Sequence, residues 1–336
     1  MIKPIGAIRS DCVMKILHIV PGVGDATNGM VVVANFLAKE AVDARIVDLS
    51  VVSKHDVASA DEVWVHGMWL PKEWVICFRV LCAGKRLVRM THGSLSPVYL
   101  KRQGRWKKWL VGPIERYFLR RCEKIVATCD AEKEWIEVYL GKKCPEIVVT
   151  DIKRFFKLGV RGESFGFRVS GFELERGECN SQLTTHNSQL NLLYLGRRHP
   201  LKGGEYFETA VRQLQKSTRS TRSTRLKIEL KIVSNAFGEE LEKVWDWCDV
   251  LVLPTLSENF GLVVAEALER GKRVITTDGA PVWGEGLSRV ERVDRVEVGD
   301  VFYGYDGRLI YLKGYRDGSD ETRVELLKKA IEKISV

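Results

Sequence analysis

The sequence predicts an α/β protein made of two halves, each with a doubly wound parallel sheet. Apolar strand-like segments alternate with helical segments, and this alternation fades between about 151 and 190 before it restarts. The length of 336 residues is sufficient for two domains of about 150 residues each. With 45% hydrophobic residues the chain can bury a large core, which excludes a largely disordered protein.

The first half opens with an apolar strand at 15–20, a glycine-rich turn at 21–29 and a helix. Strand, glycine-rich turn and helix form the start of a βαβ unit. Further elements are expected in the same alternation: strands at 44–50, 62–67, 85–93 and 124–129, and a helix at 130–140.

The second half repeats the pattern. We expect strands at 190–196, 226–234, 249–254 and 272–278, helices at 203–215, 239–248 and 261–271, and an amphipathic terminal helix at 320–334. The repeated Ser-Thr-Arg triplets at 216–225 are expected to form a solvated surface loop.

Four regions follow from this pattern. They are an N-terminal domain at 14–160, an irregular linker or hairpin at 161–189, a C-terminal domain at 190–318 and a terminal helix at 319–336. Binding sites in such folds lie at the carboxyl ends of the strands, and a cleft between the halves is the expected ligand position.

Charge and cysteine usage narrow the function classes. The net charge of +9 makes an anionic partner plausible. The eight cysteines show no Cys-x-x-Cys pair, which argues against a zinc site or a disulfide framework and fits a cytosolic protein. The first thirteen residues do not have the pattern of a signal peptide, and no apolar run approaches the roughly 18 residues of a membrane-spanning helix.

Two loops contain candidate phosphate-binding groups. Gly22 and Gly24 could let backbone amides approach a phosphate, although the glycine turn taken alone favours a merely flexible loop. In the loop after the strand at 190–196, Arg197 and Lys202 are spaced to neutralise a diphosphate. The alternative is that these two are ordinary solvent-facing basic residues.

Two glutamates follow the strand at 249–254. Glu258 lies in the loop before a helix, and Glu266 lies on that helix. A carboxylate can accept hydrogen bonds from two sugar hydroxyls at once. Periodicity alone predicts a solvated helix face at Glu266, which is the alternative.

These segments together resemble the retaining glycosyltransferases of family 4, in the glycosyl transferases group 1. SENFGLVVAE, at 257–266, resembles the paired-glutamate motif of that family, and GRRHPLKG, at 196–203, resembles its Gly-Arg…Lys-Gly loop. THGSLSP, at 91–97, is similar to its His-Gly segment. The resemblance spans roughly 14–334 and is thin at 151–190, 216–225 and 284–316. It implies the GT-B fold, two Rossmann-like domains with the nucleotide-sugar bound mainly by the second.

The resemblance also implies roles for individual residues. Arg197 and Lys202 would stabilise the leaving diphosphate, Glu266 would bind the ribose, and Glu258 would hold the transferred sugar. His92 would contact that sugar near its anomeric carbon, whereas His18 and His66 are interpreted as structural. The remaining donor-binding positions are Gly22, Gly24, Gly196, Asn259, Phe260, Gly261 and Leu262. No metal and no cofactor are implied.

A basic segment at 99–125 has nine lysines and arginines against two glutamates, with aromatic residues interleaved. Such a segment suits an anionic membrane surface or the groove for an anionic acceptor. A solvated helix packed on its own domain is the alternative, and nucleic acid is not expected, because no nucleic-acid-binding module accompanies it. The candidate membrane or acceptor residues are Lys101, Arg102, Arg105, Trp106, Lys107, Lys108 and Trp109.

The sequence therefore predicts a retaining, metal-independent glycosyltransferase that uses a nucleotide-sugar donor. Its expected acceptor is a glycan or glycolipid of the lipopolysaccharide or exopolysaccharide type, and its expected location is the cytoplasm, peripheral to the inner face of the membrane. Two alternatives stay open: a sugar-nucleotide epimerase of the GT-B type, and a catalytically inactive glycosyltransferase-like binding subunit.

Overall fold

The computed structural model describes residues 13–25, 28–102, 109–156, 189–220, 227–234, 236–285, 287, 294–296, 299–305 and 307–334. The chain divides into two compact units. The N-terminal unit comprises Met1–Leu95, Leu100–Ala127 and Lys133–Thr150, and the C-terminal unit comprises Ser96–Tyr99, Thr128–Glu132 and Asp151–Val336. Apart from residue 189, the expected linker at 161–189 lies outside the described residues.

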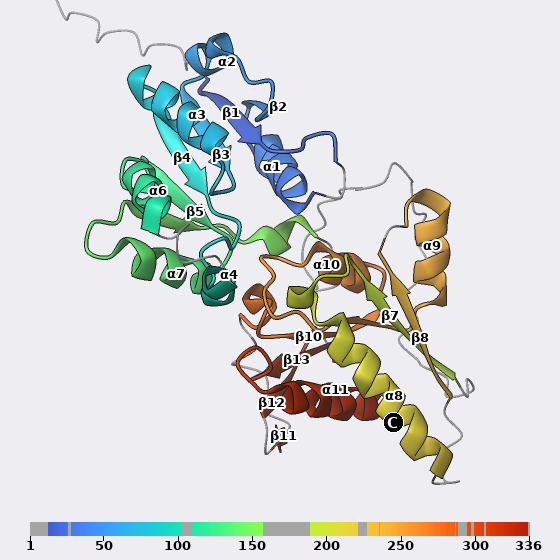
Figure 1. Ribbon diagram of the computed structural model, residues 1–336. Helices are drawn as coiled ribbons and strands as arrows, with labels where there is room; N and C mark the ends of the chain where they lie inside the picture. The colour runs from blue at the N-terminus through green and yellow to red at the C-terminus, as the bar shows by residue number, and fades with distance from the viewer. Residues whose placement is uncertain are drawn as a thin grey trace, which may run out of the picture. The chain divides into compact units, whose positions relative to one another are not determined.

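The first sheet is fully parallel, with strand order β2-β1-β3-β4-β5-β6 (Figure 1). Its strands are β1 (Lys15–Val20), β2 (Asp43–Asp48), β3 (Glu62–His66), β4 (Arg86–Met90), β5 (Lys124–Ala127) and β6 (Glu146–Val149). The helices in this part of the chain are α1 (Gly29–Glu40), α2 (Lys54–Ser59), α3 (Pro71–Cys82), α4 (Pro97–Arg102), α6 (Gly112–Leu119) and α7 (Asp130–Leu140). The predicted strands are confirmed, and β6 is an additional one.

Alternation along β1 sends its side chains to the two faces of this sheet. Leu17 and Ile19 are fully buried in the core that α2, α3, α6 and α7 cover. Val20 lies on the opposite face, where it packs against Val31 of α1. Both faces of the sheet are therefore covered by helices, as parallel sheets require.

The loop that follows β3 is held by a buried charge cluster. Arg89 of β4 is fully buried, donates to the carbonyl of Gly67 at 2.7 Å, and lies 3.5 Å from a carboxylate oxygen of Glu115. Glu115 also accepts from the backbone amide of Trp69 at 2.6 Å. Burial raises the pKa of the nearby Glu73 to about 7, against the opposing effect of the Arg89 charge. These contacts fix the backbone at the carboxyl end of β3.

The second sheet has the order β11-β12-β13-β10-β9-β7-β8 (Figure 1). Its strands are β7 (Gln189–Leu195), β8 (Lys227–Val233), β9 (Val250–Leu253), β10 (Arg273–Thr277), β11 (Asp294–Val296), β12 (Gly299–Gly304) and β13 (Leu309–Lys313). The helices of this region are η1 (Ile152–Phe155), η2 (Pro200–Lys202), α8 (Gly204–Ser220), α9 (Gly238–Trp247), α10 (Leu262–Glu269), η3 (Pro281–Trp283) and α11 (Asp320–Ile334).

The predicted parallel strands are confirmed here by β7 to β10. β13 is a further parallel strand that was not predicted, and β11 and β12 pair in antiparallel fashion at one edge. The terminal helix at 320–334 is confirmed by α11. The surface loop expected at 216–225 is wrong for its first half, because α8 continues to Ser220. The amphipathic pattern of α8, whose Phe207 and Val211 pack in the core beside α11, supports a helix longer than the triplet composition suggests.

The loops that follow β7 and β9 are joined backbone to backbone. The amide of Leu256 donates to the carbonyl of Leu201 at 2.8 Å, and the Thr255 hydroxyl donates to the same oxygen at 3.0 Å. Gly203 has φ +67, and a Cβ atom there would lie 1.9 Å from the carbonyl oxygen of Pro254. Only glycine permits this approach, so the junction depends on the residue type at this position.

We expect Gly203→Ala to destabilise the protein by at least about 2 kcal/mol, because the left-handed backbone alone costs a non-glycine residue about 1–3 kcal/mol and the clash adds to it. Gly204→Ala is the matched control, since a Cβ there meets Tyr194 at an ordinary 3.6 Å. Urea unfolding of both variants measures the difference. Equal midpoints for the two would contradict the proposed constraint.

Candidate functional site

The candidate site lies at the carboxyl ends of β7 and β9. The chain leaves β7 for β8 on one side of it, and β9 lies on the other side, so the strand order reverses between β7 and β9. Ligands of open α/β sheets bind at such a reversal, outside the carboxyl ends of the strands. The loops that contain Arg197, Lys202 and Glu258 follow these two strands directly.

A short 3-10 helix, η2, positions Lys202 in the first loop. His199 caps this helix, because its ring accepts from the amide of Leu201 at 3.2 Å. The amide of Lys202 donates to the His199 carbonyl at 2.8 Å. The start of the loop is held by the Tyr194 hydroxyl, which donates to the Arg197 carbonyl at 3.0 Å.

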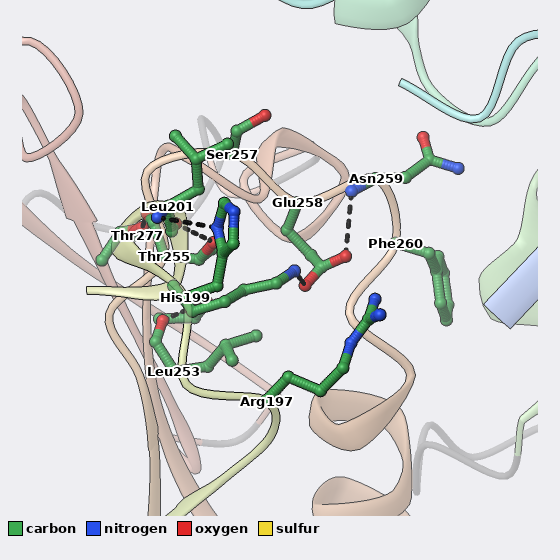
Figure 2. Close-up of polar contacts among 12 residues, drawn as sticks. Arg197, His199, Leu201, Leu253, Thr255, Ser257, Glu258, Asn259, Phe260 and Thr277 are labelled. Carbon is green, nitrogen blue, oxygen red and sulfur yellow. Dashed lines mark hydrogen bonds and ion pairs between the residues drawn. The ribbon is translucent and has the colours of Figure 1, made fainter. Parts of the chain in front are cut away.

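Lys202 and Glu258 are brought together although 56 positions separate them in the sequence. The Lys202 ammonium forms an ion pair with the Glu258 carboxylate, and the two side chains remain 22% and 21% exposed. The second oxygen of Glu258 accepts from the amide of Asn259 at 3.2 Å (Figure 2). A ligand can reach this pair, because neither charge is sealed from solvent.

Arg197 lies beside this pair without joining it. Its residue is exposed, and its side chain forms no ion pair with any described residue. Figure 2 shows its guanidinium pointing toward the side on which the Glu258 carboxylate lies. A guanidinium that joins no ion pair among the described residues is suited to bind two oxygens of a phosphate group.

Glu266 lies in the second turn of α10, where the contacts of the described residues do not link it to the Lys202–Glu258 pair. Burial raises the pKa of its carboxyl group to about 7, while Arg270 opposes this shift and Glu269 and Glu242 add to it. Arg270 itself pairs with Glu242 at 3.0 Å. Glu266 is thus a half-buried carboxyl group whose charge the local environment does not fully compensate.

The residues between these glutamates combine a buried anchor with a sharp turn. Phe260 is 3% exposed, stacks on Phe156 at 5.4 Å, and its carbonyl accepts from the Trp283 indole. Gly261 has φ +72 and caps the start of α10, and Leu262 is the first residue of that helix. The Phe260 ring is therefore part of the core, and a contact of Phe260 with a ligand would come from its backbone. Gly196 directly follows β7, and its amide donates to the carbonyl of Val233 at 2.9 Å.

The candidate residues of the N-terminal unit follow β1 and β4. Gly22 has φ +74, and the neighbouring amide of Val23 donates to Asp48 at 2.7 Å, while the space around Gly24 is open. His92 follows β4 with φ +48, and its Nε2 lies 2.8 Å from Nδ1 of His66. Burial lowers the pKa of His92 to about 3.

Sequence reasoning did not predict this histidine contact. A second contact joins His66 to His18, because Nδ1 of His18 lies 3.0 Å from Nε2 of His66. A signal was present, because His18, His66 and His92 each lie in or just after a predicted strand, and parallel strands bring such positions to one edge.

The basic segment is only partly described. Arg105, Trp106, Lys107 and Lys108 lie outside the described residues. Lys101 and Arg102, at the end of α4, are exposed, and Trp109 is 77% exposed. None of the described helices combines the length and the apolar character that crossing a bilayer requires. In the described ranges, no group of three or more His, Cys, Asp or Glu side chains could hold a metal ion.

Comparisons with known proteins bear on the fold and on one family model. Residues 189–290 match the family model described as glycosyl transferases group 1. No curated protein matches the sequence. Similar solved structures include HepE of Anabaena in complex with UDP, with a TM-score of 0.51, 12% identity and coverage of 96% of this chain and 91% of that one.

Two further solved structures are similar over nearly the whole chain. Sucrose-phosphate synthase from Thermosynechococcus elongatus has a TM-score of 0.52 and 12% identity, covering 95% of this chain and 90% of that one. The α,α-trehalose-phosphate synthase from Burkholderia xenovorans, in complex with glucose-6-phosphate, has a TM-score of 0.54 and 10% identity. The match covers 95% of this chain and 92% of that one. The chain therefore has the GT-B fold predicted from its sequence, and its residues 189–290 match the model of the glycosyl transferases group 1.

Proposed function

We propose that this protein is a glycosyltransferase that moves a sugar, with retention of its anomeric configuration, from a nucleotide-sugar to a hydroxyl of a cell-surface glycan or glycolipid. The observation that carries the proposal is the solvent-accessible Lys202–Glu258 ion pair at the β7/β9 strand reversal, with the uncommitted Arg197 guanidinium beside it. HepE of Anabaena was solved with UDP and with UDP-glucose, which supports a nucleotide-sugar as the donor class.

The ion pair gives the site a way to couple donor binding to sugar binding. In the free protein Lys202 and Glu258 satisfy each other's charge. A donor diphosphate would bind to the Lys202 ammonium and to Arg197. Because this breaks the ion pair, the Glu258 carboxylate could then accept hydrogen bonds from the sugar hydroxyls. Fixed cations stabilise the negative charge that develops on the departing diphosphate, without reorganising during the reaction.

The chemical step breaks the bond between the anomeric carbon and the diphosphate oxygen and forms one to the acceptor oxygen on the same face of the sugar. The acceptor proton passes to an oxygen of the departing diphosphate. Glu266 would hold the ribose hydroxyls and His92 the transferred sugar. Arg197 and Lys202 supply the positive charge in this scheme, so transfer is expected to persist in the presence of EDTA.

Variants of the ion pair separate diphosphate binding from transfer. We expect Lys202→Ala to weaken the binding of a nucleoside diphosphate by about 10- to 100-fold, because this is the affinity lost when one charge-assisted hydrogen bond is removed. Glu258→Gln should leave this binding intact or tighten it, because it frees Lys202, and should lower transfer by about 100-fold. Calorimetry with UDP, GDP and ADP and donor turnover measure the two effects.

Arg198→Ala is the matched control for these variants. Arg198 lies on the same loop, but its side chain pairs with Glu208 at 3.6 Å. If Lys202→Ala, Glu258→Gln and Arg198→Ala all bind and turn over like the wild type, the site assignment is wrong. Conversion of the donor without an acceptor would identify the epimerase, and absence of nucleotide binding in the wild type would identify an inactive subunit.

The buried position of Glu266 predicts a pH-dependent stability. The folded protein retains this proton up to about pH 7, whereas the unfolded chain releases it near the ordinary value of 4.5. The folded state therefore loses stability as the pH rises from about 4.5 to about 7. Glu266→Gln has no such loss, so its melting temperature should exceed that of the wild type by more at pH 8 than at pH 4.5. An equal difference at the two pH values would contradict the burial of this carboxyl group.

We further propose that the acceptor is reached at an anionic bilayer through the region around α6. Leu110, Ile114 and Tyr117 are exposed at helical spacing, next to the exposed Trp109. The opposite side of α6 is buried through Phe118 and Leu119. An exposed apolar stripe within a segment of nine lysines and arginines matches the composition of an interfacial helix.

Co-sedimentation with liposomes tests this surface. We expect binding to vesicles that contain phosphatidylglycerol, weakened by salt because the attraction is electrostatic. Trp109→Ser combined with Leu110→Ser should reduce the binding, whereas Phe237→Ser, at a 60% exposed aromatic residue of the C-terminal unit, should not. Equal binding to neutral vesicles, or an equal effect of the control, would rule out the proposed surface.

A further inference from the structure

Three histidines form a hydrogen-bonded row in the N-terminal unit. His18 lies within β1, His66 is the last residue of β3, and His92 follows β4. The His18 Nδ1 to His66 Nε2 distance is 3.0 Å, and the His66 Nδ1 to His92 Nε2 distance is 2.8 Å. No step of the proposed reaction uses His18 or His66.

The row runs from the interior of the sheet to its carboxyl edge. His18 and His66 are 1% and 0% exposed, and His92 is half-buried. β1 is flanked by β2 and β3, so β1 and β3 form the strand reversal of this sheet. The row therefore ends at the edge where a ligand of the N-terminal unit is expected.

Each ring of the row is neutral at neutral pH. Burial lowers the pKa of His18 to about 4 and that of His92 to about 3. The pKa of His66 is well below its ordinary value, mainly through burial and also through the charges of His92, His18 and Arg89. A neutral imidazole has one N–H and one lone pair. Each N···N contact needs one N–H as donor and one lone pair as acceptor. The three ring protons can therefore be placed in only two ways along the row.

The buried end of the row decides between these arrangements. Nε2 of His18 is buried and has no hydrogen-bond partner among the residues that the structure describes. In one arrangement this atom is an N–H without an acceptor, and in the other it is a bare lone pair beside the Trp64 ring, whose centroid is 5.0 Å from that of His18. Orphaned buried N–H groups are rarer in proteins than under-satisfied acceptors. The favoured arrangement therefore has Nδ1–H on His18 and Nδ1–H on His66.

This arrangement fixes the state of His92. Its Nε2 accepts from His66, so its proton is on Nδ1, the nitrogen that faces away from the row. The backbone of His92 has φ +48 and that of Gly93 has φ +71. A left-handed conformation is costly for a non-glycine residue, and it concentrates at functional sites where a side chain must be aimed.

We propose that His66, held in turn by His18, is a positioning residue that keeps His92 as a neutral imidazole donating from Nδ1 to an oxygen of the bound sugar. The assignment of that oxygen to a sugar rests on the proposed function. His92 then has no free lone pair, so it cannot accept the acceptor proton. The row restricts His92 to hydrogen-bond donation.

Nitrogen-15 NMR of the histidine rings tests the assignment without any substrate. The chain has six histidines, so ring resonances can be assigned by single substitutions, with the exposed His55 as a reference. At pH 7.5 we expect the Nδ1–H form for His18, His66 and His92. An Nε2–H form or an imidazolium at His92 overturns the proposal.

Variants of His66 provide the second test. His66→Leu removes the donor to His92, so the Nδ1–H form should no longer be fixed and kcat for transfer should fall on the order of tenfold. His66→Asn can place an amide N–H near the former Nδ1, and it should restore both the ring signature and part of the rate. Equal losses in the two variants, with the His92 tautomer unchanged, would assign His66 a merely structural role.

The two readouts separate this inference from the proposed function. If no nucleotide-sugar is turned over while the NMR shows the expected tautomers, the proposed function fails and the proton arrangement of the row is retained. If transfer occurs while His92 is in the Nε2–H form, the inference fails and the proposed function is retained.

Discussion

The candidate site depends on the close backbone approach between the loops that follow β7 and β9. Gly203 lets the first loop touch the carbonyl of Pro254, and the Leu201 carbonyl accepts two hydrogen bonds from the second loop. This junction sets the position of Lys202 relative to Glu258. Without this junction, the cation and the carboxylate would lie on two independently placed loops. Their pairing would then be less favourable, because long side chains lose conformational entropy when they pair.

The degree of burial distinguishes the two kinds of charge cluster in this protein. Arg89 and Glu115 are sealed in the N-terminal core, where removing either partner would leave an uncompensated charge, so they serve as a fixed support for the loop after β3. Lys202 and Glu258 remain partly exposed. A pair that water can reach can exchange partners with an incoming anion at modest cost, which suits a binding site.

Much of the fold could be predicted because its signals are local. The alternation of apolar strands and amphipathic helices predicted both sheets, and α7 and α11 have the predicted bounds. The parallel strands β6 and β13 were not predicted. The edge strands β11 and β12 were not predicted either, since a short antiparallel edge lacks the continuous apolar run of a buried parallel strand. The extension of α8 to Ser220 was not predicted, because the Ser-Thr-Arg triplets are typical of a loop in composition although the helix continues into them.

The sequence by itself determined which residue types follow which strands, and so the choice of Arg197, Lys202, Glu258 and Glu266 as candidates. Only the tertiary structure decided that Lys202 pairs with Glu258 and that Arg197 joins no ion pair among the described residues. It also decided that burial, opposed by Arg270, is the main influence on the Glu266 carboxyl group. It alone joined His18, His66 and His92 into one row. Strand order and register place residues distant in sequence at one edge of a sheet, and no local pattern specifies distances between side chains on different strands.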